Sequence, residues 1–214
     1  DYIGSIKARL QGLLIGSKGL MLNTKRSVDF KKIITKKVIL EIEEIKSGSE
    51  KSLIMGFVLI NLIEAIKANH KENRSFKHIT LIEEAHRLLG KITYGDSANK
   101  KQGVEVFSDM LAEVRKYGES LIIVDQIPNK LIPEVLKNTN TKIVHKLFAQ
   151  DDKDAIGNTM ALNDEQKNFL SNLETGRAIL FTQGFSNPVQ VQIEKKYNIS
   201  EEDFIDETLI RNNV

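Results

Sequence analysis

The sequence predicts an α/β fold whose mostly parallel sheet is flanked by helices and ends in an antiparallel hairpin, and two observations support this. Short apolar runs rich in β-branched residues alternate with longer amphipathic segments, as in parallel sheets whose strands are joined by helices. The last two runs, 177–183 and 188–194, are separated only by the residues GFSN. A connection this short favours an antiparallel hairpin at one edge of the sheet.

The predicted elements follow the chain in order. Ahead of the first strand, the spacing of Ile3, Ala8 and Leu10 indicates a helix, and a passage rich in Gly and Lys comes after it. The apolar run at 53–63 is too short to span a bilayer and predicts a helix that is buried on nearly every side. Six apolar runs are predicted to be strands: 37–42, 78–82, 120–124, 142–147, 177–183 and 188–194.

Two further helices carry recognisable end signals. In the segment 102–117 apolar residues recur on one helical face, and Gly118 follows as a C-cap. A later helix begins at Asn163, with Gln166 three residues further on, which is a variant of the capping box. These signals place helices between successive strands, as a parallel sheet requires.

Composition sets limits on function. The chain contains no Cys, which excludes disulfides and thiolate metal sites and fits a reducing cytoplasm. Its 31 Lys and Arg against 29 Asp and Glu leave a net charge of +2, so a surface that binds nucleic acid must be a local patch. No signal peptide is recognisable, and we expect a cytoplasmic protein with no membrane association.

The stretch HITLIEEAHRLLG (78–90) places two adjacent acids, Glu83 and Glu84, where a predicted strand ends. In open parallel sheets, ligands bind outside the carboxyl ends of the strands. One such carboxylate can hold Mg²⁺ through its water shell. Its neighbour can orient or deprotonate the water that attacks a γ-phosphate. Gln126 follows the next predicted strand and could bridge that water and the phosphate.

Other interpretations of these residues are open. The two acids could cap the following helix, AHRLL, through its dipole. His78, Glu83, Glu84 and His86 could suggest a metal hydrolase, although the two histidines flank a strand-to-turn transition and lack the helical spacing of H-E-x-x-H. The tetrapeptide EEAH is also similar to the DEAH box of helicases. Those enzymes have a Ser-Ala-Thr motif on the next strand, where this chain has VDQ.

The chain resembles the HerA/FtsK class of hexameric, RecA-like ATPases, and most of all its HerA-like members. The resemblance covers residues 30–195 and rests on the order and spacing of four segments: LIEEAHRLL, LAEVRKYGESLIIVDQIP, LKNTNTKIVHKL and LETGRAILFTQGFSNPVQVQI. It implies a RecA-like core. For the complete protein it implies a homo-hexamer that hydrolyses ATP with Mg²⁺ and acts on double-stranded DNA, with a nuclease or another effector as a further partner.

Carried over position by position, the resemblance assigns Glu83 to the magnesium-side acid of Walker B and Glu84 to the catalytic glutamate. Gln126 matches the sensor glutamine. Three cations match positions from which members of the class offer positive charge, in some cases across the subunit interface: Arg115, Lys142 and Lys146. The chain departs from the usual pattern in having Glu at 83, Lys where fingers are usually Arg, and Asp125 beside the sensor, where a carboxylate must point away from the γ-phosphate.

A phosphate-binding loop is not recognisable. The motif G-x-x-x-x-G-K-[ST] must stand between a strand and a helix, whereas the nearest segment, Gly12–Gly19 (GLLIGSKG), has the wrong spacing and follows a helical run. We therefore expect the C-terminal part of such an ATPase, inactive by itself. In this interpretation residues 1–36 are the helical tail of an insertion, 37–195 are the second half of the RecA-like core, and 196–214 are a C-terminal tail.

Two other functions are compatible with the same motifs. A type IV secretion or conjugation ATPase shares them. The N-terminal domain of the complete protein would distinguish that motor from a HerA-like one. The core could also act as a nucleotide-gated scaffold for an effector nuclease, in which case turnover would not respond to DNA.

Overall fold

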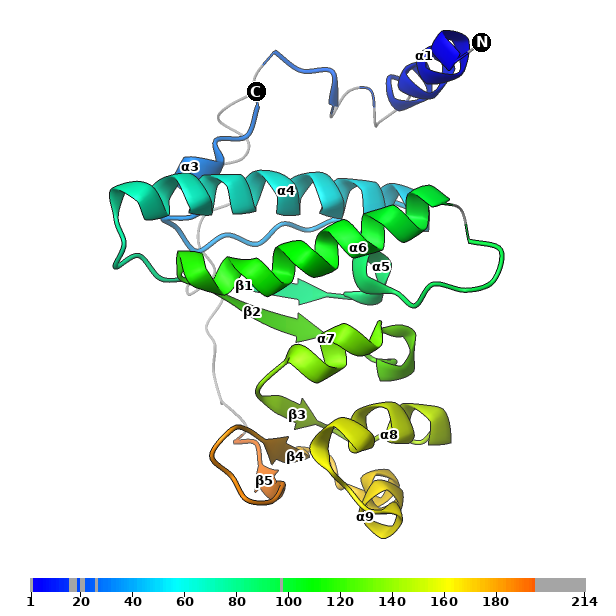
Figure 1. Ribbon diagram of the computed structural model, residues 1–214, viewed down its shortest axis with the longest axis vertical. Coiled ribbons are helices and arrows are strands. Elements are labelled where there is room, and N and C mark those ends of the chain that lie inside the picture. The colour runs from blue at the N-terminus through cyan, green and yellow to red at the C-terminus, as the bar shows by residue number, and fades with distance from the viewer. Residues whose placement is uncertain (1, 16–18, 20–21, 26, 97, 195–214) are drawn as a thin grey trace. The chain divides into compact units, whose positions relative to one another are not determined.

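A computed structural model of the chain describes residues 2–15, 19, 22–25, 27–96 and 98–194 (Figure 1). The chain divides into two compact units. The first comprises Asp1–His78 and Lys116–Ser120, and the second comprises Ile79–Arg115 and Leu121–Val214. The three-part division expected from the sequence stays a prediction, and its last part, 196–214, lies outside the described residues.

The described part of the first unit is helical. Its helices among the described residues include α1 (Tyr2–Leu13), α3 (Phe30–Ile33) and α4 (Gly48–Glu72), so the helix predicted near the N-terminus is confirmed. Helix α3 begins after Asp29, whose carboxylate accepts hydrogen bonds from the backbone N–H groups of Lys31 and Lys32. One core cluster consists of Ile34, Leu62, Ala65 and Ile66, against which pack Phe30, Ile33, Phe76 and Tyr117.

The strand predicted at 37–42 is wrong. These residues form neither strand nor helix, and Val38, Ile39 and Leu40 are all exposed. An apolar run is stable as a strand only where a neighbouring strand supplies hydrogen bonds. None of the strand pairs among the described residues includes this run, so its apolar character does not produce a strand here.

Helix α4 is longer and less buried than its sequence suggests. The Ser47 hydroxyl accepts the Glu50 N–H at its start, and the helix runs for 25 residues. Phe57 and Ile60 are 42% and 40% exposed, so the prediction of burial on nearly every side is wrong. By length and composition alone α4 could cross a bilayer. The core helices of soluble proteins pass the same test, however, and Ile66 is fully buried in the core of this unit.

Strands β1 (His78–Glu83) and β2 (Glu119–Val124) are hydrogen-bonded neighbours and point in the same direction (Figure 1). Between them the chain forms α5 (His86–Leu89), α6 (Ala98–Glu113) and the 3-10 helix η1 (Val114–Tyr117). Helices α6 and η1 confirm the helix predicted at 102–117. Gly118 follows with a φ of 83°, a left-handed backbone that Gly adopts without strain. Because the strands are parallel, their carboxyl ends meet at one edge.

The remaining strands form an antiparallel sheet in the order β3–β4–β5. Strand β3 (Lys142–Val144) pairs with β4 (Arg177–Phe181), which pairs with β5 (Val189–Gln192). The C-terminal hairpin and the α/β class are confirmed, although β3 is shorter than predicted. The other helices are η2 (Pro128–Lys130), α7 (Pro133–Asn138), α8 (Gln150–Gly157), η3 (Asn158–Met160), α9 (Asp164–Phe169) and η4 (Leu170–Asn172).

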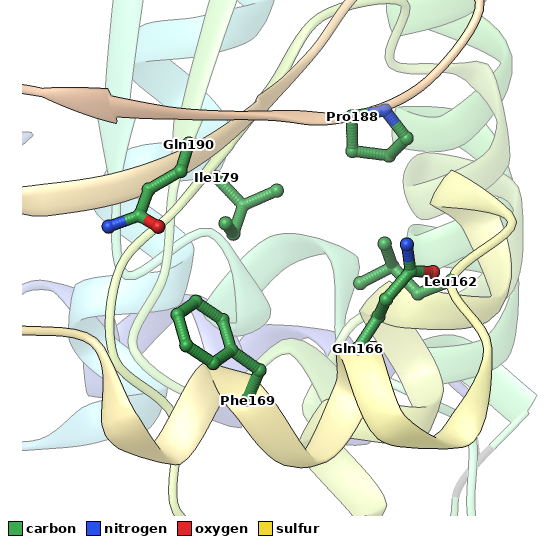
Figure 2. A pocket seen from close by; sticks show the side chains of 6 residues that line it. All are labelled: Leu162, Gln166, Phe169, Ile179, Pro188 and Gln190. Carbon is green, nitrogen blue, oxygen red and sulfur yellow. The ribbon is translucent and has the colours of Figure 1, made fainter.

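Helix α9 begins at the predicted capping box. Asn163 Oδ1 accepts the Gln166 N–H and Gln166 Oε1 accepts the Asn163 N–H, each at 2.9 Å. A hollow between α9 and the β4–β5 hairpin is lined by Leu162, Gln166, Phe169, Ile179, Pro188 and Gln190 (Figure 2). None of these six side chains is ionisable, so the hollow offers no acid–base chemistry.

Candidate active site at the ends of β1 and β2

Glu83 and Glu84 both lie at the carboxyl end of β1, and both are exposed. Glu83 is the last residue of the strand. Glu84 has a backbone φ of 50°, in the left-handed region that residues other than Gly, Asn and Asp seldom adopt. Such conformations cost about 1–3 kcal/mol and gather at functional sites. The backbone of Glu84 therefore marks this turn as a candidate site.

The interpretation of the two acids as a helix cap finds no support in α5. The N-cap residue of this helix is Ala85, with no side-chain capping bond, and its first turn contains no acid. The His86 N–H at the start of α5 instead donates to Asp125 Oδ2 at 2.9 Å. Glu84 pairs with Arg87, whose Nε lies 2.6 Å from Glu84 Oε2. This ion pair leaves the Glu84 side chain 53% exposed.

Asp125 links the two strand ends. Its Oδ2 accepts the His86 backbone N–H and lies 2.8 Å from His86 Nδ1, and its Oδ1 accepts the Ile127 N–H at 3.0 Å. The Asp125 side chain is only 3% exposed. The acid beside the sensor position therefore points at His86. It ties the turn after β2 to the turn after β1, which carries Glu84.

We expect Asp125→Ala to lower the free energy of unfolding by about 1–3 kcal/mol, because it leaves the partly buried backbone N–H groups of His86 and Ile127 without their side-chain acceptor. Urea unfolding measures the change. The matched control is Asp109→Ala on α6, where the carboxylate is exposed and the change should stay within about 0.5 kcal/mol. If Asp125→Ala unfolded at the same urea concentration as the control, the hydrogen bonds that Asp125 accepts would contribute nothing to stability.

The structure brings Glu83, Glu84, Asp125 and Gln126 to one edge of the β1–β2 sheet. Gln126 is exposed and follows the buried Asp125 directly. This edge can present carboxylate oxygens, a base and an amide to a phosphate group. In the part of the chain that the structure describes, no group of three or more His, Cys, Asp or Glu could hold a metal. The exposed carboxylate of Glu83 could hold Mg²⁺, because this ion takes few protein ligands and keeps several waters.

The two histidines of the metal-hydrolase interpretation are held by different carboxylates. His78 Nδ1 lies 2.7 Å from Glu119 Oε2, and the Glu119 side chain is fully buried. His86 is paired with Asp125. Each histidine is thus paired with its own carboxylate. The metal-hydrolase interpretation therefore has no support in the described residues.

The three candidate cations lie on other elements. Arg115 belongs to η1 and is exposed. Lys142 is only 7% exposed, its Nζ donates to the Thr139 carbonyl, and burial lowers the pKa of its amine. Lys146 is exposed, with Nζ 5.7 Å from the centroid of the Phe148 ring. Of the three, Arg115 and Lys146 can therefore meet another molecule without leaving a buried contact.

Comparison with solved structures identifies the class of fold. The genome packaging NTPase B204 of Sulfolobus turreted icosahedral virus 2, in complex with AMPPCP, matches with a TM-score of 0.56. It is 14% identical and the match covers 79% of this chain and 73% of that one. VirB4 of Thermoanaerobacter pseudethanolicus matches with a TM-score of 0.52 and 20% identity over 71% of this chain and 39% of that one. The fold is thus one used by NTPases.

The sequence relatives are more specific. The DNA double-strand break repair helicase HerA of Sulfolobus acidocaldarius is 31% identical over 146 residues, or 64% of this chain. That of Saccharolobus solfataricus is 31% identical over 130 residues, or 60%. The chain spans only 28% and 25% of these relatives, and no family model matches it. The chain is similar in sequence to these HerA helicases, and its predicted resemblance to the HerA/FtsK class is confirmed.

Proposed function

We propose that the chain forms part of a HerA-like ATPase that, in the complete protein, couples ATP hydrolysis to DNA translocation or processing. The observation that carries the proposal is the exposed pair Glu83–Glu84 at the end of β1, tied by the contact of the buried Asp125 carboxylate with His86 to the strand end that carries Gln126. The HerA relatives, which are named as DNA double-strand break repair helicases, support the choice of DNA.

Each polar residue of the edge has a role in this proposal. Glu84 orients or deprotonates the water that attacks the γ-phosphate. Glu83 would hold Mg²⁺, whose charge offsets the negative charge that develops on the phosphate. Gln126 hydrogen-bonds both the water and the γ-phosphate. Glu84 must first leave Arg87, which costs little because exposed ion pairs are weak.

A neighbouring subunit completes the site. We propose a homo-hexamer in which Arg115, Lys142 or Lys146 reaches the nucleotide of the adjacent subunit. The exposure of Arg115 and Lys146 favours these two, and the planar guanidinium of Arg115 suits a phosphate better than an ammonium does. The proposed substrate is double-stranded DNA in the cytoplasm, and a nuclease or another effector is a further partner.

The turnover of the complete protein tests this function. We expect ATP hydrolysis, measured as phosphate release, to rise when duplex DNA is added, because a translocating motor couples the two processes. The 214 residues by themselves should show no turnover, because no phosphate-binding loop is recognisable in them. Hydrolysis that ignores DNA would contradict a motor and favour the nucleotide-gated scaffold.

A further inference from the structure

A cluster of cations surrounds Tyr117 in the first unit. The centroid of the Tyr117 ring lies 5.9 Å from Lys67 Nζ and 5.1 Å from Lys116 Nζ, within the range of cation–π attraction. The His70 ring meets it edge-on at 5.8 Å. Tyr117 also packs against the core of this unit. The Tyr117 ring is therefore positioned by the core and attracts the ammonium groups of Lys67 and Lys116.

The segment after Lys67 adds further cations. Lys71 lies in the last turn of α4, Arg74 and Lys77 lie between α4 and β1, and all three are exposed. Gly118 lets this segment approach η1, because a Cβ at residue 118 would collide with the Phe76 carbonyl and lie 3.7 Å from Lys77 Cδ. We call the following residues the Tyr117 cluster: Lys67, Lys71, Arg74, Lys77 and Lys116.

The Tyr117 cluster is a local excess of positive charge on a nearly neutral chain. Residues 67–77 contain four Lys or Arg and a single acid, Glu72, whereas the whole chain carries +2. Glu64 pairs with Lys67 at 3.1 Å, but its side chain is 68% exposed, so water screens this pair. Glu119 is buried and paired with His78. The positive charges of Lys71, Arg74 and Lys77, which are all exposed, are therefore available to an external anion.

We propose that the Tyr117 cluster binds the phosphate backbone of nucleic acid. Its cations extend over a helix end, a turn and the adjoining η1, so each can contact a separate phosphate, which one small anion could not offer. Lys67 and Lys116 are already positioned against the Tyr117 ring, which reduces the side-chain entropy lost on binding. The choice of duplex DNA rests on the proposed function.

Binding of labelled duplex DNA to the 214-residue chain, without nucleotide, tests the inference. Fluorescence anisotropy is recorded between about 50 and 200 mM salt. The variant Arg74→Gln/Lys77→Gln/Lys116→Gln is compared with Lys31→Gln/Lys36→Gln/Lys37→Gln, which alters exposed lysines of the same unit. Both triple variants lower the formal net charge from +2 to −1. A difference between them therefore reports the position of the charges.

The variant in the Tyr117 cluster should bind DNA at least about tenfold more weakly. The plot of log affinity against log salt should also become less steep by about 3, one for each phosphate contact removed. The control should keep the affinity of the unaltered chain. Equal weakening in both variants, or no binding by the unaltered chain, would overturn the inference. Tighter and equally cluster-dependent binding to phosphatidylserine vesicles would overturn it in favour of a membrane surface.

This result is separable from that of the proposed function, because the binding assay contains no nucleotide. If the Tyr117 cluster binds DNA but DNA does not stimulate turnover in the complete protein, the proposed function alone fails. If turnover responds to DNA but the chain does not bind it through the cluster, this inference alone fails.

Discussion

Replacing Glu84 with Gln is expected to abolish ATP hydrolysis by the complete protein while ATP binding stays largely intact. Gln keeps the size and hydrogen bonding of the side chain but cannot take a proton from water. Loss of a positioned base lowers the rate by about 10²–10⁴. Phosphate release and equilibrium binding of ATP measure the two properties, and a fall in turnover at unchanged affinity assigns the loss to the chemical step.

The matched control is Glu105→Gln, which makes the same chemical change at an exposed position of α6. It should alter neither hydrolysis nor binding. If Glu84→Gln kept more than about a tenth of the rate, which is far above what remains when a general base is lost, Glu84 would not be the base. Weaker ATP binding by the Glu84→Gln variant would show instead that the Glu84 side chain helps to hold the nucleotide.

Arg115→Ala is expected to lower turnover in the complete protein by about 10³ or more, as removal of a trans-acting arginine does in related phosphoryl transfer. The exposure of Arg115 and its forked donors make it the first candidate, and Lys146→Ala is the second. Lys142→Met is the third, because it fills the buried position of Lys142 without the amine. The control is Lys101→Ala at an exposed position of α6, which should leave turnover unchanged. Turnover and ATP binding are measured for each.

Mixed assemblies test whether the cation acts across an interface. Subunits with Arg115→Ala and subunits with Glu84→Gln should each be inactive alone. Their mixture should regain part of the activity, because some interfaces then combine an intact cation with an intact acid. If Arg115→Ala, Lys146→Ala and Lys142→Met all left turnover unchanged, the trans-acting assignments would be abandoned.

The features that the sequence predicts correctly are those encoded by local patterns. The capping box of Asn163 and Gln166 needs only four residues, and the hairpin of β4 and β5 needs only two runs and a short connection. The strand ends that carry Glu83 and Gln126 follow from apolar runs that stop at polar residues. Alternation of strand and helix then indicates that parallel strands meet at one edge.

The features that the sequence does not predict depend on residues far apart in the chain. The contact between Asp125 and His86 spans 39 positions and depends on how β1 and β2 are aligned. The sequence signals it only through an unexpected acid beside Gln126, the predicted sensor glutamine. The burial of Lys142, and the absence of a strand at 37–42, likewise depend on which segments pack nearby. Apolar periodicity does not contain that information.

The left-handed backbone of Glu84 bears on how position 84 can vary. Gly adopts this conformation freely, and Asn does so more readily than Glu. A library of variants at this position, selected for stability alone, should therefore enrich Gly and Asn. Selection for hydrolysis should retain Glu instead. Stability and hydrolysis thus favour different residues at position 84. When both are selected together, the frequency of Glu among the surviving variants measures how far the gain in catalysis outweighs the loss of stability.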